Sequence, residues 1–363
     1  MSMGRYFLLS LLLTIGFPLV VSGFESNTFD AGLLRYAVID NGRNEVAVAG
    51  FLGDKSYDVR LSVEVPSSVT SAGVTYTVTA IGERAFEECR SITELTLPET
   101  ITEIGDYAFS FCVEMRKMHI PASVAKIGYS LFSDCWQLRE VNLPEWLTEI
   151  PKGTFFGCYN LGRIHIPESV RVIGEGSFSG CRSLSDLNLP EGLVEICSSA
   201  FTRCGFVNLS LPESLVYIRE FAFSSCELLK SVSLPASLNR IGDEAFECCR
   251  SLTEINSWAV EPPALKGYEV AGVTFGVWTD VPKDAVVYVP PGCVEAYRNA
   301  NGWDYFTDFR SFEGSGIESI DAEAAGWQAE YFLPSGIRVD GSSLRPGLYI
   351  KRMAGKVCKV VVR

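Results

Sequence analysis

Apolar residues return along the middle of the chain with a period of 23 positions, interrupted by a single step of 22. In each period an isoleucine is followed after five residues by a phenylalanine and after three more by a cysteine. The phenylalanines are Phe86, Phe109, Phe132, Phe155, Phe178, Phe201, Phe223 and Phe246. The cysteines are Cys89, Cys112, Cys135, Cys158, Cys181, Cys204, Cys226 and Cys249. Columns that keep one register predict a solenoid in which each repeat forms one coil.

Each coil also carries a pattern of leucines after its cysteine. The pattern L-x-x-L-x-L appears as Leu184, Leu187 and Leu189, and a proline follows it. This is the leucine-rich-repeat signature, whose repeats are about 20–29 residues long. We therefore predict a leucine-rich-repeat solenoid of the α/β type, a right-handed superhelix of mostly short parallel β-strands. The 22-residue step places a one-residue deletion between Cys204 and Phe206.

One coil shows the path expected for all of them. A short parallel strand lies around residues 94–97, and the chain turns at a proline and returns through Ile101 and Ile104. A short helical or 3₁₀ turn around residues 108–109 would complete the coil. A single coil cannot bury its own apolar face, so the stacked phenylalanines are expected to form a continuous spine.

The eight cysteines of the repeat have two interpretations. Free cysteine packs as a small apolar residue, and one thiol per coil favours a buried, reduced column. Parallel strands lie about 4.8 Å apart, however, so neighbouring thiols are near disulfide range and partial pairing stays open. A zinc site is not predicted, because the chain has no paired C-x-x-C motifs.

The chain divides into five segments by composition. Residues 1–23 combine Arg5 with an apolar run and small residues before position 24, which predicts a signal peptide. Residues 24–80 are expected to form an N-terminal β cap and first coil, and residues 81–258 the repeats. Residues 259–313 are expected to form a closing coil and C-terminal cap. Residues 317–363 would be a small β domain.

Side chains alternate along a strand, so the residues that flank the buried leucines should point outward. We call these two columns the strand face. The first column is Glu94, Lys117, Glu140, Arg163, Asp186, Asn208, Ser231 and Glu254. The second column is Thr96, His119, Asn142, His165, Asn188, Ser210, Ser233 and Asn256. The candidate partner-binding residues are His119, Asn142, His165, Asn188, Lys117, Glu140, Arg163 and Asp186.

The strand face has an alternative interpretation without a partner. Charges alternate in sign along the first column from Glu94 to Asp186, so neighbouring coils can pair them. The second column can likewise form hydrogen bonds between coils. The two histidines lie two coils apart, which puts their backbones about 10 Å apart, too far to share one metal ion. We therefore predict no metal site.

Two further surface features flank this face. Glutamates follow the proline in five coils and form an acidic rim: Glu99, Glu145, Glu168, Glu191 and Glu213. Such a rim steers a basic partner, holds calcium or is simply solvated. Trp136, Trp146 and Tyr159 lie at turns, where exposed aromatic side chains act as binding anchors or pack against neighbouring coils.

Charge and motifs restrict the classes of function. The formal net charge is −13, which disfavours binding to the phosphates of nucleic acids. Motifs of the G-x-S-x-G, H-E-x-x-H, P-loop and G-x-G-x-x-G classes are missing from the sequence. Buried thiols and outward histidines cannot form a Cys–His pair. The sequence therefore predicts a protein that is not an enzyme and needs no cofactor.

The repeat unit I-G-x-x-A-F-x-x-C-x-x-L resembles the BspA-type leucine-rich repeats of bacterial surface proteins. The flanks resemble that family too, at residues 63–66 and 73–82 upstream and at 262–265 and 287–297 downstream. The resemblance covers roughly residues 60 to 312. It implies a secreted or cell-surface protein that adheres to a protein or glycan of a host or a neighbouring microbe. The alternative is an envelope-associated scaffold without a specific ligand.

The last segment is similar to a different kind of module. Residues 331–339 and 344–350 resemble the small β-sandwich tails that sort cargo in type IX secretion, although Pro334 and Ser335 depart from the usual turn. This similarity implies attachment at the outer membrane. The alternative is a small β domain without a sorting role.

Overall fold

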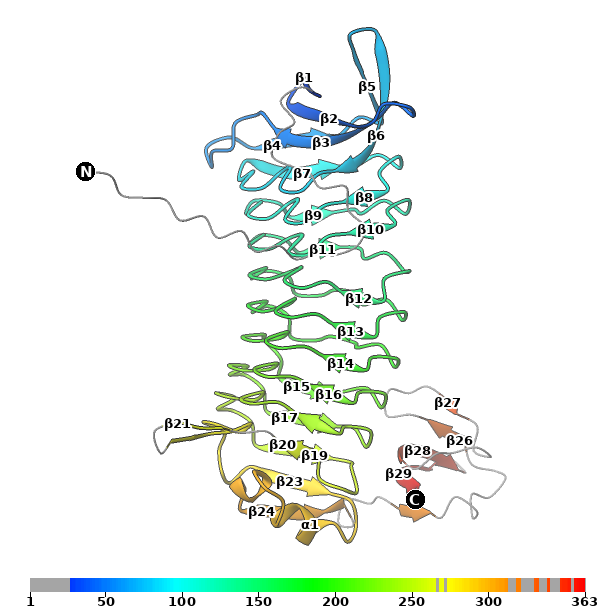
Figure 1. Cartoon of the computed structure of the whole chain (residues 1–363). Coiled ribbons are helices and arrows are strands. Elements are labelled where there is room, and N and C mark those ends of the chain that lie inside the picture. The colour runs from blue at the N-terminus through cyan, green and yellow to red at the C-terminus, as the bar shows by residue number, and fades with distance from the viewer. Residues whose placement is uncertain are drawn as a thin grey trace, which may run out of the picture.

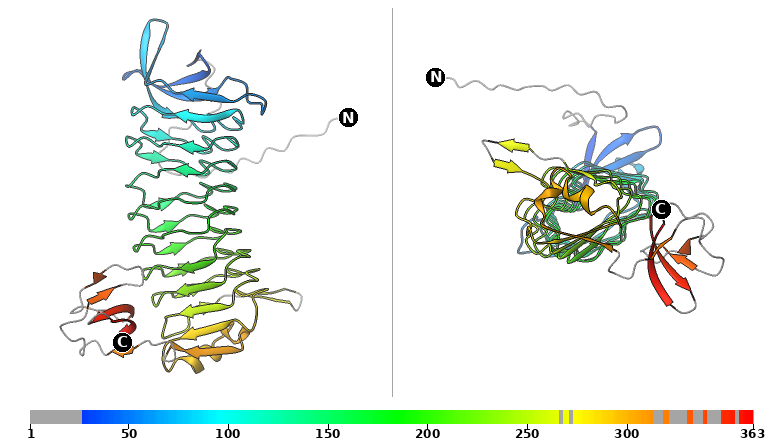
Figure 2. Two further views of the ribbon diagram at one scale, coloured as in Figure 1. Left: turned by 180° about the vertical axis from the view of Figure 1, so that it is seen from behind. Right: turned by 90° about the horizontal axis from the view of Figure 1, so that it is seen from below.

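The chain is described here by a computed structural model. It covers residues 27–265, 268–270, 273–312, 318–320, 330–332, 338–339, 347–353 and 356–362. The expected signal peptide, residues 1–23, and parts of the expected sorting motifs lie outside these described residues. The repeats stack into one elongated column (Figure 1), and in the view along its axis the coils lie over one another (Figure 2).

Two rows of parallel strands run along this column. The first row carries the L-x-L residues: β4 (Leu61–Glu64), β7 (Ile92–Thr96), β9 (Lys117–Met118), β11 (Glu140–Val141), β15 (Asn208–Ser210), β17 (Ser231–Leu234), β19 (Glu254–Ser257), β23 (Val286–Val289) and β24 (Asp308–Ser311). The strands of the second row end in the repeated isoleucine, except the last, which ends in leucine: β6 (Val74–Ile81), β8 (Glu103–Ile104), β10 (Lys126–Ile127), β12 (Glu149–Ile150), β13 (Val172–Ile173), β14 (Glu195–Ile196), β16 (Tyr217–Ile218), β18 (Arg240–Ile241) and β20 (Ala264–Leu265). We call the second set the isoleucine row. The stacked parallel strands confirm the predicted solenoid.

The third side of each coil consists of tight turns instead of the predicted helical or 3₁₀ turn. Tyr107 and Phe111 have φ angles of 54° and 58°, in the left-handed region that interrupts a helix. Their amides bond to the next coil, with Tyr107 N–H donating to the Tyr129 carbonyl at 3.0 Å and Phe111 N–H to that of Ser133 at 2.8 Å. The intervening Ser110 N–H bonds back to Tyr107 at 3.0 Å. Bonds between coils thus replace the bonds that a helix would make, and we call this side the turn side.

The phenylalanine spine lies beneath the turn side. Neighbouring rings stack at 5.2–5.8 Å between centroids from Phe86 to Phe246, and all eight are fully buried. Phe51 of the N-terminal cap and Trp278 continue the stack at its two ends. The 22-residue coil keeps this register because Phe206 fills the leucine column and contacts the rings of Phe201 and Phe223 edge-on.

The repeat cysteines are buried and free, as the first interpretation of the sequence predicts. Each thiol from the second coil onward donates to a phenylalanine carbonyl of the preceding coil, as Cys158 does to Phe132 at 3.1 Å. Burial raises the pKa of the Cys226 thiol to about 12. These thiols are therefore held protonated within the core.

One coil interrupts the isoleucine row. Gly128 N–H donates to the Ile104 carbonyl at 2.8 Å, and Gly174 N–H donates to that of Ile150 at 2.9 Å. The corresponding residue between them is Pro151, which has no N–H to donate to Ile127. The row accordingly separates into one sheet that ends at β10 and another that begins at β12.

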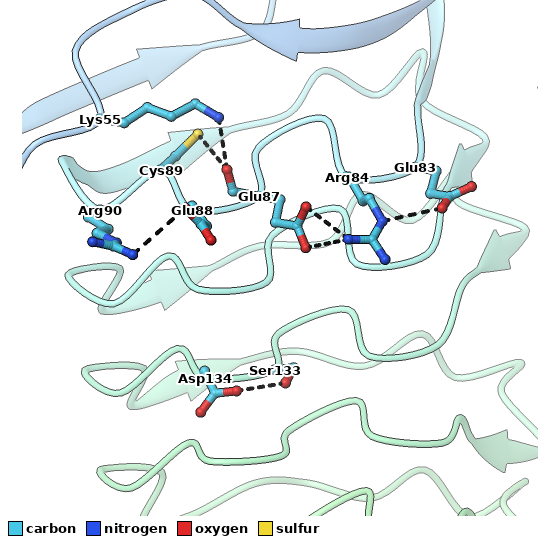
Figure 3. Close-up of polar contacts among 9 residues, drawn as sticks. All are labelled: Lys55, Glu83, Arg84, Glu87, Glu88, Cys89, Arg90, Ser133 and Asp134. Carbon is cyan, nitrogen blue, oxygen red and sulfur yellow. Dashed lines mark hydrogen bonds and ion pairs between the residues drawn. The ribbon is translucent and has the colours of Figure 1, made fainter. Parts of the chain in front are cut away.

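The N-terminal strands close the open end of the solenoid. The strands β1 (Thr28–Ala31), β2 (Leu34–Asp40), β3 (Glu45–Phe51) and β5 (Ser68–Ser71) join the isoleucine row through β6. The first repeat thiol, Cys89, has no preceding repeat, and it donates to the Glu87 carbonyl, which also accepts the Lys55 ammonium at 2.9 Å (Figure 3). The first thiol thus bonds within its own coil, and Lys55 of the cap contacts the same carbonyl.

At the other end the coil pattern continues with an insertion. A hairpin of β21 (Tyr268–Val270) and β22 (Val273–Phe275) projects from the column before the turn at Trp278 (Figure 2). The helix α1 (Val294–Arg298) and the 3₁₀ turn η1 (Trp303–Tyr305) then cover the last core layer. The Trp303 indole donates to the Pro263 carbonyl at 3.0 Å, which ties this cover to the coil above it.

The last segment contains a separate small sheet. Its strands are β25 (Glu318–Ile320), β26 (Glu330–Phe332), β27 (Arg338–Val339), β28 (Gly347–Met353) and β29 (Lys356–Val362). Their order is β25-β29-β28-β26-β27, with β25 and β29 parallel and the other pairs antiparallel.

Candidate binding face

The strand face contains a shallow groove of about 610 Å³ over four coils. Its lining residues are Lys117, Met118, His119, Glu140, Val141, Asn142, Arg163, Ile164, His165 and Asn188. A second groove of about 260 Å³ continues from it and contains Asp186, Asn188 and Glu213. The eight candidate residues therefore lie along one continuous surface, and all eight are exposed. The strand register of Asn208 with Ser231 and Ser210 with Ser233 confirms the predicted columns beyond the deletion.

The backbone is open beneath these grooves. Within the described chain, residues 163–166 and 186–189 make no backbone hydrogen bond to a neighbouring coil, whereas β15, β17 and β19 pair regularly beyond them. The N–H and C=O groups of a strand lie in the plane of the sheet and point toward the neighbouring strands, here the neighbouring coils. The strand pairing of this face is thus interrupted at the predicted site.

Three of the candidate side chains are occupied by contacts within the protein. The Lys117 ammonium pairs with the Glu140 carboxylate at 2.8 Å, as the alternating signs predict. The Asn142 amide bonds to both the N–H and the carbonyl of Ile120, at 2.9 and 3.0 Å, in the manner of a peptide group. This part of the face matches the interpretation without a partner.

The other candidate side chains are largely unoccupied. Among the described residues, Arg163 has no ion pair with Glu140 or Asp186, so the predicted charge ladder fails at this coil. The His165 imidazole lies 3.7 Å from the Glu145 carboxylate, which brings the acidic rim to the edge of the groove. A guanidinium without an internal partner retains its full capacity to bind a carboxylate.

The acidic rim changes character at the second groove. Glu99, Glu145 and Glu168 are exposed, but Glu213 is half-buried. Burial raises the pKa of Glu213 from 4.5 to about 7. A hydrogen bond from Ala236 N–H lowers this pKa, but its effect is smaller than that of burial. Glu213 is therefore the rim residue whose charge changes near neutral pH.

Replacing Glu213 by glutamine is expected to remove a loss of stability that occurs as pH rises. Unfolded glutamate ionises from about pH 4.5, whereas folded Glu213 keeps its proton until about pH 7, so the wild-type free energy of unfolding falls across this window. Relative to wild type, the variant should gain about 1–3 kcal/mol between about pH 4 and pH 8. Urea unfolding at both pH values measures this difference. Glu168→Gln, at an exposed rim glutamate, is the control. If the difference in free energy of unfolding from wild type were independent of pH for both variants, the raised pKa of Glu213 would be contradicted.

The aromatic residues at the turns, Trp136, Trp146 and Tyr159, show both exposure and contact with neighbouring coils. Trp136 and Tyr159 are partly exposed and stack on one another at 6.1 Å, with the Arg182 guanidinium 5.2 Å from the Tyr159 ring. Trp146 donates its indole N–H to the Val124 carbonyl at 2.7 Å. In neighbouring coils a serine or threonine donates between coils from the same position, as Ser123 does to Ile101. This hydroxyl column is a repeating signal that the sequence analysis missed.

Two other kinds of feature are absent from the described residues. No group of three or more histidine, cysteine, aspartate or glutamate side chains there is arranged to hold a metal ion. No helix in that part of the chain has the length and apolarity needed to cross a membrane.

Comparison with known proteins identifies the repeat. The family model for the BspA type leucine-rich repeat region (6 copies) matches residues 65–181 and 148–260, together more than half of the chain. No curated protein compared with the chain is significantly similar to it.

Solved structures with a similar fold come from several bacteria. A leucine-rich repeat protein from Bacteroides ovatus is 22% identical with a TM-score of 0.48, over 81% of this chain and 82% of that one. A leucine-rich cell surface protein from Faecalibacterium prausnitzii is 20% identical with a TM-score of 0.38, over 78% and 94%. The pneumococcal vaccine antigen PcpA is 16% identical with a TM-score of 0.32, over 78% and 98%. By the extent of the matched repeats, this chain belongs to the BspA-type leucine-rich-repeat family.

Proposed function

We propose that the chain is an extracellular or cell-surface binding protein that recognises a protein or glycan through its strand face. The observation that carries this proposal is the continuous groove over the candidate residues, where the side chains of His119, Arg163 and Asn188 are exposed. Exposed polar groups without internal partners form hydrogen bonds with a ligand at little cost to the protein. Membership of a family with cell-surface relatives supports this class of function over catalysis.

The place of action is part of the same proposal. Residues 1–23 would direct export, and residues 317–363 would sort the protein or attach it at the outer membrane. Catalysis is not proposed, because the exposed groove lacks the enclosed acid–base or nucleophile arrangement that an active site requires.

Replacing Asn142, His165 and Asn188 together by alanine is expected to abolish partner binding. All three side chains are exposed, so the variant should remain folded and lose about 1 kcal/mol through the Asn142 bonds to Ile120. Binding is measured on an array of glycans and matrix proteins with the mature wild-type chain and the variant. Circular dichroism verifies the fold.

The matched control replaces Thr96 and Asn256, which belong to the same column outside the groove, by alanine. Binding that survives the triple replacement would contradict the strand-face site. It would indicate a site on the acidic rim or in the C-terminal segment, residues 317–363. A wild-type chain that binds nothing on the array would favour the second candidate, a structural scaffold. The internal bonds of Lys117 and Asn142 are the specific observation in favour of that candidate.

A further inference from the structure

The second groove of the strand face differs from the first in its lining. It lies between the two coils that the one-residue deletion separates, and its volume is about 260 Å³. Its floor includes Leu187 and Leu189, whose side chains are only half-buried. Its polar lining residues are Asp186, Asn188, Glu191, Asn208, Ser210 and Glu213. The groove therefore combines a partly exposed apolar floor with an acidic border.

The carboxylates of this border are not neutralised within the described chain. Asp186, Glu191 and Glu213 form no ion pair with a described residue, and no lysine, arginine or histidine lines the groove. By contrast, Glu175 on another side of the column pairs with Lys152 at 2.9 Å. The second groove thus carries negative charge that an outside cation can compensate.

Two cations of neighbouring positions are engaged elsewhere. Arg163, one coil away from Asp186, lines the first groove. The Arg171 guanidinium donates to the backbone carbonyls of Glu168 and Val170 at 2.8 and 3.1 Å. Neither arginine lines the second groove. A cation from outside the chain would therefore meet the carboxylates without displacing an internal partner.

Glu191 and Glu213 form the most crowded part of the border. They occupy the same rim position on neighbouring coils, about 4.8 Å apart, and both are half-buried. Burial, and to a smaller extent the charge of Glu191, raises the pKa of Glu213 to about 7. A cation placed between the two carboxylates would offset both effects, because an opposite charge stabilises the ionised form.

We propose that this groove binds an arginine or lysine side chain in a basic segment of a partner protein. The inference rests on the proposed binding function of the strand face, of which the groove is a part. The aliphatic stem of that side chain would lie on Leu187 and Leu189, and its cationic head would reach Glu191 and Glu213. A further cation of the segment would meet Glu168, the exposed rim glutamate of the preceding coil.

A cationic polysaccharide fits this lining less well. An amino sugar carries its ammonium group directly on a ring rich in hydroxyls, so it has no aliphatic stem to cover Leu187 and Leu189. Arginine and lysine have such a stem and keep their charge at its end. The apolar floor beside the carboxylates therefore favours a basic protein segment.

The test compares four soluble ligands in a direct binding assay with the mature chain at about pH 8. The first is a short peptide in which arginine alternates with serine, and the second replaces each arginine by citrulline, its neutral analogue. Trimethylated chitosan fragments and spermine carry the same number of positive charges as the first peptide. The arginine peptide is expected to bind at least about tenfold more tightly than the other three. Equal or tighter binding of any other ligand would overturn the proposal.

Two double variants separate the groove from the general negative charge of the protein. Glu191→Gln with Glu213→Gln should weaken binding of the arginine peptide about tenfold or more. Glu149→Gln with Glu227→Gln removes the same charge from exposed positions away from the strand face, and should weaken it less than about threefold. Circular dichroism verifies the fold of both proteins. Equal losses would show that bulk charge suffices and would overturn the proposal.

The pH dependence of binding tests the contact with Glu213. Because the ionised carboxylate holds the cation, lowering the pH from about 8 to about 6 should weaken binding of the arginine peptide about tenfold. Glu213→Gln should abolish this dependence. His119→Gln with His165→Gln, which removes both histidines of the chain, should preserve it. A dependence that survives Glu213→Gln would overturn the proposal.

Failure of this inference can be told apart from failure of the proposed function. A chain that binds a component of the array, and loses it when Asn142, His165 and Asn188 are replaced, keeps its strand-face site. If that binding survives replacement of Glu191 and Glu213, and the arginine peptide does not bind, only the basic partner is overturned.

Discussion

Replacing Phe155 by alanine is expected to lower the free energy of unfolding by about 3–5 kcal/mol. The ring is fully buried and stacks on Phe132 at 5.7 Å and on Phe178 at 5.2 Å. Because coils in a solenoid contact only their neighbours, a cavity there breaks the interface on both sides of one coil. The midpoint of urea unfolding, followed by circular dichroism, measures the effect.

The adjacent residue provides a matched control for this loss. Phe156 is 46% exposed, so Phe156→Ala removes the same ring from the same coil without creating a cavity. Its effect should stay below about 1 kcal/mol. Equal losses for the two variants would show that the spine does not carry the stability of the column.

Replacing Gly205 by alanine should cost about 3 kcal/mol, because the new methyl group has no space. A Cβ atom at this position would lie 2.2 Å from the Arg182 carbonyl oxygen, which belongs to the backbone and cannot rotate away. The close approach follows from the deletion, since the 22-residue coil must cover the same circuit with one residue fewer. Thermal unfolding of the variant measures the cost.

Gly50→Ala is the comparison for this second prediction. A Cβ atom there meets no atom within 4 Å, and its backbone is not left-handed. The change in unfolding free energy should stay within about 0.5–1 kcal/mol. If Gly205→Ala lowered the free energy of unfolding by as little, the shortened coil would be able to shift and accommodate the methyl group, which would contradict the prediction.

The period of the sequence predicts the core and the outward columns well. Burial of Phe178 and Cys181, and exposure of His119 and His165, depend only on the register of a repeating coil. The isoleucine row keeps its register across the deletion, with Ile196 opposite Ile218, and Phe206 compensates for the missing residue in the core. Features that recur in each coil are therefore predictable from one chain.

Other features depend on contacts between particular coils and were not predictable. The left-handed residues of the turn side include tyrosine and arginine, which carry no turn signal of their own, although glycines occupy the equivalent positions in two coils. Bonds to the next coil stabilise that conformation in the folded column. Likewise, the pairing of Lys117 and the isolation of Arg163 follow from side-chain geometry, since the sequence offers both of them an acidic neighbour.

The uneven distribution of bonds around each coil has a mechanical consequence. The turn side is joined at every step, as at Phe132 to Thr154, Phe155 to Ser177 and Phe178 to Ala200, all at 2.7–2.8 Å. The strand face lacks such a seam at residues 163–166 and 186–189, whereas the isoleucine row from β12 to β18 is paired like the turn side. Separation of neighbouring coils along the strand face at these residues would therefore break no backbone hydrogen bond, whereas separation along either of the other two sides would.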